Sequence, residues 1–112
     1  MSEVQRRRSP RYAFIASAEL LEPQTDVRIA TRVSELSLNG CYMDMLNPFP
    51  VGTPVLVKIS DDKATFQSKA RVIYAHPNFG AGVVFLEPEP QNLTVLKGWI
   101  SEAEKDPGRL LG

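Results

Sequence analysis

Apolar and polar residues alternate along most of this chain, and this period of two constrains its fold more than any other feature. The pattern is clearest at residues 12–20 and 27–33, where it is typical of half-buried β-strands. The loop between them, Glu-Pro-Gln-Thr-Asp at residues 22–26, predicts a hairpin. Turns rich in Gly, Pro, Asn and Asp separate four further predicted strands, at residues 41–45, 54–60, 65–76 and 82–86.

Six short strands joined by tight turns predict a mainly β fold, as an antiparallel barrel or sandwich. Closing the sheet into a barrel would remove its exposed edges. The length of 112 residues suits a single domain.

The pattern changes to helical spacing after Pro88. Leu93, Leu96 and Ile100 are three and four residues apart, which predicts an amphipathic helix over residues 90–105. Its apolar face could plug one end of the barrel or bind a partner. We expect three regions: an Arg-rich N-terminal arm (1–11), a β-barrel domain with the helix (12–104) and a loose tail (105–112).

The composition excludes several classes of protein. One cysteine permits no intrachain disulfide, and one histidine leaves little for metal ligation. No apolar run reaches the roughly 18 residues of a spanning helix, and no signal-like segment begins the chain, so we expect a cytoplasmic protein without an integral membrane segment. No set of nucleophile, base and orienting group can be assembled, so we expect no enzymatic activity.

The net charge of zero hides a basic N-terminus. Arg6, Arg7, Arg8 and Arg11 stand against Glu3 alone, which gives the first twelve residues a net charge of +3. Guanidinium groups stack on flat rings and bind phosphate or a guanine edge through two parallel hydrogen bonds. The segment is therefore either a ligand-binding arm or a solvated tail.

A second unusual segment runs from Glu35 to Gly40. On a strand, Glu35 and Ser37 would point outward together while Leu36 and Leu38 enter the core. Gly40 is suited to a positive φ or to a close backbone approach. A carboxylate and a hydroxyl placed in this way can hydrogen-bond a guanine base.

An alternative is that Glu35 only forms a surface ion pair with Arg32 or Arg71.

These two segments resemble the motifs of a known family. Arg7 to Arg11 resembles the RxxxR motif of PilZ domains, and Glu35 to Gly40 resembles their [D/N]xSxxG motif. The resemblance continues at residues 51–59, 70–72 and 82–85 and covers roughly residues 5–100. It implies a six-stranded antiparallel β-barrel with a C-terminal α-helix. It also implies binding of the bacterial second messenger cyclic di-GMP, with no metal and no other cofactor.

The resemblance also implies roles for single residues. Arg7 and Arg11 would clamp guanine edges and phosphates. Glu35 and Ser37 would hydrogen-bond a guanine, and Gly40 would permit close approach. Arg6 could stack on a second nucleotide molecule.

Glu35 departs from the family motif, which has Asp or Asn at this position. The extra methylene moves the carboxylate outward by about 1.5 Å, and hydrogen bonds weaken quickly beyond about 3.2 Å. Loss of one bidentate base contact could weaken binding about tenfold to a hundredfold.

Three functions compete at this point. The first is a cyclic di-GMP receptor whose mobile arm is ordered by the ligand, which exposes or covers a surface for an unidentified effector protein. The second is a protein-interaction module that does not bind nucleotide, which Glu35 favours. The third, a nucleic-acid-binding arm, is disfavoured because four arginines on an acidic body give limited affinity.

Five other residues are assigned no functional role. His76 lacks an acidic or cysteine partner for catalysis. Cys41 should pack inside the barrel or beside the motif without becoming reactive. Asp61 and the neighbouring Asp62 should form a solvated turn, and Trp99 should pack on the helix.

Overall fold

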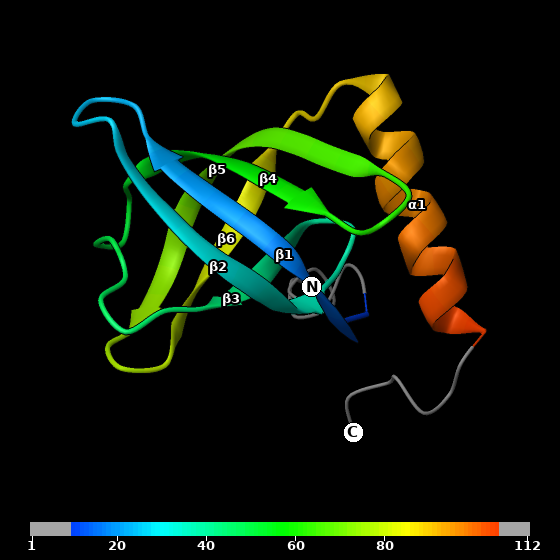
Figure 1. Ribbon diagram of the computed structural model, residues 1–112, viewed down its shortest axis with the longest axis horizontal. Coiled ribbons are helices and arrows are strands. Elements are labelled where there is room, and N and C mark those ends of the chain that lie inside the picture. Colours follow the sequence, from blue (N-terminus) through cyan, green and yellow to red (C-terminus); the bar gives the residue numbers. More distant parts are fainter. Residues whose placement is uncertain (1–9, 106–112) are drawn as a thin grey trace, which may run out of the picture.

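The computed structural model describes residues 10–105. Six antiparallel strands close into a barrel in the order β1-β2-β3-β6-β5-β4, and one helix follows them (Figure 1). The elements are β1 (Tyr12–Glu22), β2 (Val27–Leu36), β3 (Gly40–Asp44), β4 (Pro54–Ser60), β5 (Thr65–His76), β6 (Gly80–Leu86) and α1 (Pro90–Glu104). The expected six-stranded barrel with a C-terminal helix is confirmed, and the sandwich alternative is wrong.

The interior of the barrel is filled by alternate residues of the strands, as the period of two predicts. On β1, the even-numbered residues from Tyr12 to Leu20 are buried and the intervening ones are not. On β4, Val55, Val57 and Ile59 form the corresponding inward row. These rows meet in one apolar core, in which Phe66 of β5 is wholly buried.

Helix α1 lies across one end of the barrel, against β5 and β1 (Figure 1). Its buried face is formed by Leu96, Trp99, Ile100 and Ala103. The Trp99 ring packs 5.1 Å from that of Phe14, measured between centroids. The apolar face of the helix therefore covers the barrel, and the predicted packing role of Trp99 is confirmed.

The first half of β2 departs from the predicted half-buried pattern. Val27 is 44% exposed, and Ile29 and Thr31 are only partly buried. The cause is the short β3, which has five residues against the ten of β2. Pairing of β2 with β3 begins only at Val33, so the earlier residues project beyond the closed part of the barrel.

Candidate functional site

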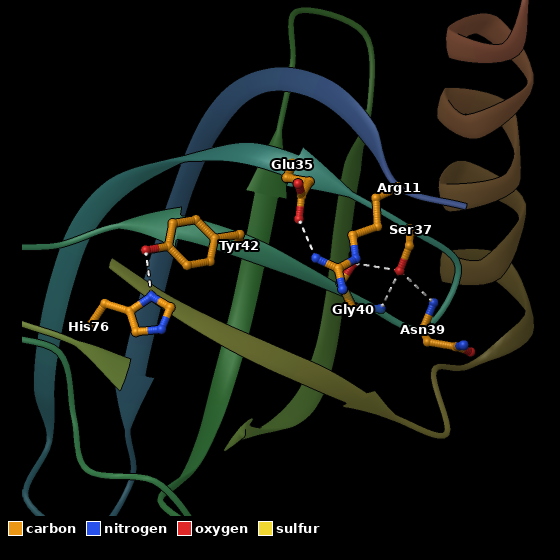
Figure 2. Close-up of polar contacts among 7 residues, drawn as sticks. All are labelled: Arg11, Glu35, Ser37, Asn39, Gly40, Tyr42 and His76. Carbon is orange, nitrogen blue, oxygen red and sulfur yellow. Dashed lines mark hydrogen bonds and ion pairs between the residues drawn. The ribbon is translucent and has the colours of Figure 1, made fainter. Parts of the chain in front are cut away.

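The turn between β2 and β3 is organised by a single hydroxyl group. Strand β2 ends at Leu36, and Ser37 begins the turn. The Ser37 Oγ accepts hydrogen bonds from the backbone N–H groups of Asn39 and Gly40, both at 3.2 Å (Figure 2). The Ser37 N–H in turn donates to the Gly40 carbonyl at 2.9 Å. Hydroxyl groups often stabilise tight turns in this way.

The turn corrects two expectations. Ser37 is not on the strand, because β2 ends at Leu36. Its hydroxyl group instead accepts a hydrogen bond from the main chain of the turn. The alternation predicts Leu38 in the core, but Leu38 is 40% exposed because the turn breaks the alternation after Leu36. Leu36 itself is buried, as expected.

Glu35 faces Arg11 across the outer surface of the barrel. The Arg11 Nη1 lies 3.4 Å from the Glu35 Oε1 (Figure 2). The Glu35 side chain is 22% exposed and that of Arg11 is 57% exposed. An ion pair with this exposure stabilises the fold by about 0–1 kcal/mol, so its main effect is to position the two groups.

The alternative partners of Glu35 are both engaged elsewhere. Arg32 forms an ion pair with Asp44, at 2.7 Å between Nε and Oδ2. Arg71 donates a hydrogen bond to the Gly52 carbonyl. The hypothesis of a Glu35 pair with Arg32 or Arg71 is therefore wrong.

Gly40 is required by a close approach and not by a positive φ. A Cβ atom at Gly40 would collide with the backbone carbonyl oxygen of Val83 on β6. Among the glycines of residues 10–105, a positive φ is found at Gly52. The close neighbour of Gly40 is thus the backbone of β6. Because glycine has no side chain, the turn can lie flat against this strand.

These groups border a shallow depression on the outside of the barrel. Besides Arg11 and the turn, its lining includes Gly82 of β6 and the side chains of Ile73 and Tyr74 on β5. A register shift between β5 and β6 at Val72 and Tyr74 interrupts the alternation, and Ile73 is 48% exposed. A bulge of this kind turns an extra side chain outward.

Sequence reasoning missed the aromatic wall of this depression. The ring of Tyr74 covers Gly82, where a Cβ atom would collide with it. The centroid of the Tyr74 ring lies 6.0 Å from that of Tyr42 and 5.2 Å from that of His76. Figure 2 shows the contact between the last two residues, in which the Tyr42 hydroxyl lies 3.4 Å from the His76 Nδ1. The sequence signal for this wall was the presence of Tyr74 on one predicted strand, followed by Gly80 and Gly82 near the start of the next.

Two titratable groups beside the depression are held in their neutral forms. Burial is the main cause that raises the pKa of the Tyr42 hydroxyl, and the nearby Tyr74, Asp44 and Glu35 add to it. Burial also raises the pKa of the Cys41 thiol. The expectation that Cys41 is unreactive is therefore supported, because the thiolate is the reactive form.

Together the depression offers a guanidinium, a carboxylate and the aromatic ring of Tyr74. A carboxylate accepts hydrogen bonds from paired N–H donors, a guanidinium binds phosphate or a carbonyl edge, and an aromatic face stacks on a base. The arrangement therefore suits a planar, hydrogen-bonding ligand that carries phosphate.

Two of the predicted site residues, Arg6 and Arg7, lie outside the described residues. Within residues 10–105, no cluster of three or more His, Cys, Asp or Glu side chains is arranged to hold a metal ion. In the same range, no helix is long and apolar enough to cross a membrane.

The chain matches a known protein family over most of its length. A family model described as the PilZ domain matches residues 5–102. Comparison with curated proteins gives no significant match.

Several solved structures share the fold at low sequence identity. The PilZ domain of CeSA from a cellulose-synthesizing bacterium is 19% identical, with a TM-score of 0.66 over 84% of this chain and 97% of that one. The PilZ domain of YcgR from Escherichia coli with c-di-GMP is 18% identical, with a TM-score of 0.71 over 91% and 94%. The Bacillus subtilis inhibitor of motility, MotI/DgrA, is 16% identical, with a TM-score of 0.71 over 91% of this chain and 53% of its own. The present chain thus spans about half of that inhibitor.

Proposed function

The chain belongs to the PilZ domain family, and we propose that it is a receptor for cyclic di-GMP. The observation that carries this proposal is the pair of Arg11 and Glu35, 3.4 Å apart beside the Ser37 turn. These residues come from the two segments that resemble the family's ligand-binding motifs. The similar PilZ domain of YcgR was solved with c-di-GMP, which supports the same ligand class.

Binding would exchange one ion pair for several charge-assisted hydrogen bonds. The Glu35 carboxylate would accept from the N1 and N2 donors of a guanine, while Arg11 would turn to the phosphates or the O6/N7 edge. Arg7 would join Arg11 in this clamp, and Arg6 would contact a second nucleotide. Because Glu35 is partly buried and Arg11 is more exposed, Arg11 has the greater freedom to move.

Ser37 and Gly40 would act through the shape of the turn. The Ser37 hydroxyl oxygen already accepts two backbone hydrogen bonds and lies 3.3 Å from the Gly40 carbonyl, to which it can donate. A direct contact with a guanine would therefore have to share this hydroxyl. Gly40 would keep the turn flat enough for the ligand to approach.

The ligand would order the N-terminal arm over the barrel. An effector protein in the cytoplasm would recognise this ordered state, which would be the signal.

The alternative function is a PilZ-like interaction module that does not bind nucleotide. The length of Glu35 is the observation that favours it.

Isothermal titration calorimetry with cyclic di-GMP tests the proposal. We expect binding by the wild-type chain, with the stoichiometry read from the midpoint, and loss of most of the affinity in Arg7→Ala and Arg11→Ala. Arg28→Ala is the matched control, because Arg28 is an exposed arginine on β2 outside the depression. Absence of binding at tens of micromolar, or equal effects of Arg11→Ala and Arg28→Ala, would overturn the proposal.

The alternative makes a different prediction. A module without ligand binding would form its protein complex equally well with and without cyclic di-GMP.

A further inference from the structure

The first half of β2 carries a strand edge that no other described segment covers. On one side it pairs with β1, from Val27 opposite Glu22 onward. On the other side, pairing with β3 begins at Val33, and the Thr31 hydroxyl bonds to the Asp44 carbonyl. Within residues 10–105, residues 27–30 make no backbone hydrogen bond on that second side. Alternate peptide groups of an uncovered edge are free to pair with another chain.

An exposed apolar surface lies beside this edge. The loops that carry it, at residues 45–47 and 78–79, lie at the end of the barrel far from α1 (Figure 1). Ile29 lines this surface together with Leu46 and Phe79, which are 68% and 72% exposed. The two loops that carry them are joined by backbone hydrogen bonds, from the Asn78 N–H to the Leu46 carbonyl and from the Met45 N–H to the Phe79 carbonyl. The surface is therefore held in place and is not a loose loop. Large apolar side chains exposed together commonly mark an interface.

We propose that this edge joins two copies of the chain, with each β2 extending the other copy's sheet in the antiparallel direction. The charges select the register. A twofold axis at Arg28 would set Arg28 opposite Arg28 of the second copy. An axis at Ala30 would set Arg28 opposite Arg32 of the second copy. An axis at Ile29 sets Arg28 opposite Ala30, so no like charges are opposed, and it leaves Arg32 to its ion pair with Asp44. Like charges opposite one another destabilise a sheet, so among these three positions the axis at Ile29 is favoured.

The same register completes the apolar surface. Ile29 meets Ile29 of the second copy on the face that also carries Val27, Leu46 and Phe79. Pairing therefore satisfies the free peptide groups and removes apolar surface from water at once. Because the free edge is only about four residues long, the dimer is weak and depends on concentration. The inference does not rest on the proposed function, since Arg11 and Glu35 lie at the other end of β2.

Disulfide trapping tests the register directly. In a Cys41→Ala background, Ile29→Cys places a thiol on the axis, where it meets its own copy and forms a covalent dimer on mild oxidation. Val27→Cys is the matched control. In this register Val27 faces Thr31 of the second copy, and Val27 of the second copy lies four residues further along the strand, roughly 13 Å away, which is too far for a disulfide. Equal cross-linking of the two variants, or none in Ile29→Cys, overturns the proposal.

Sedimentation equilibrium of the chain without introduced cysteines gives an independent test. We expect reversible dimerisation that Ala30→Arg weakens by roughly tenfold or more, because it sets two pairs of arginines against each other. Within one chain Ala30 lies opposite Glu19, so the new arginine is compatible with the fold. Ala30→Ser is the control, and thermal unfolding verifies that both variants are folded. A monomer at all concentrations, or a dimer insensitive to Ala30→Arg, overturns the proposal.

Discussion

The guanidinium of Arg11 and the carboxylate of Glu35 meet at 3.4 Å although the residues are 24 positions apart in the chain. The antiparallel pairing of β1 with β2 causes this meeting, since it sets Ala13 opposite Glu35 and leaves Arg11 just before the strand. The barrel itself therefore brings the two motif segments together. In the proposed receptor, the ligand would enter between groups that already satisfy each other.

Shortening Glu35 should strengthen ligand binding. Glu35→Asp restores the residue type of the family motif and draws the carboxylate back by about 1.5 Å, away from Arg11. We expect affinity for cyclic di-GMP to rise by up to roughly tenfold, measured by calorimetry. Glu35→Gln is the control for length, and it should bind more weakly than wild type because an amide accepts less strongly than a carboxylate. An Asp variant weaker than wild type would show that the turn already fits the longer side chain.

Removing the aromatic wall should weaken binding without unfolding the barrel. Tyr74→Ala deletes the ring that covers Gly82 and lines the depression. We expect roughly a tenfold loss of affinity for cyclic di-GMP, at the lower end of what stacking on a base contributes. Tyr74→Phe keeps the ring and should keep most of the affinity. If both variants bind like wild type, the ligand does not reach β5.

Much of the fold follows from local patterns, and most of the departures come from long-range pairing. The alternation predicts β1 and the helix spacing predicts α1, because each pattern reflects one face turned to a common core. The exposure of Val27 depends instead on the length of β3, which pairs with β2 from the far side of a turn. No periodicity within residues 27–33 contains that information.

The site is divided in the same way. The motif identifies Glu35 and Gly40, and the structure places both at the depression. It identifies Ser37 too, but the position of Ser37 in the turn depends on hydrogen bonds to the main chain that a strand pattern does not predict. Sequence patterns miss Tyr74 because its place in the wall depends on the register of β5 against β6.

Two glycines should respond to alanine in opposite directions. Gly98 lies within α1 with nothing within 4 Å of a Cβ atom at that position. Gly98→Ala should stabilise the chain by about 0.5–1 kcal/mol, because alanine is the better helix former. Urea denaturation followed by circular dichroism measures the change.

Gly40→Ala should instead destabilise the chain by roughly 1–3 kcal/mol, because its methyl group meets the Val83 carbonyl. The same urea experiment compares it with Gly98→Ala. Stabilisation by alanine at position 40 would contradict the close approach of the turn to β6.

Asp61 should couple the stability of the barrel to pH through α1. Its carboxylate accepts the backbone N–H groups of Lys63 and Ala64 and the Trp99 Nε1–H, the last at 2.9 Å. The hydrogen bond from Lys63 is the main cause that lowers the pKa of Asp61, while partial burial acts against it. Because the folded pKa lies below the unfolded one, the stabilisation is complete above the unfolded pKa and is lost as the pH falls through the folded pKa.

Asp61→Asn should therefore be less stable than wild type at neutral pH, and the difference should shrink below about pH 4. Denaturation at a series of pH values, followed by Trp99 fluorescence, measures the free energy of unfolding of both proteins. Asp62→Asn is the control from the same turn, and its difference from wild type should stay near zero throughout. A gap between Asp61→Asn and wild type that stays constant down to about pH 2 would mean that the ionised carboxylate contributes nothing beyond its shape.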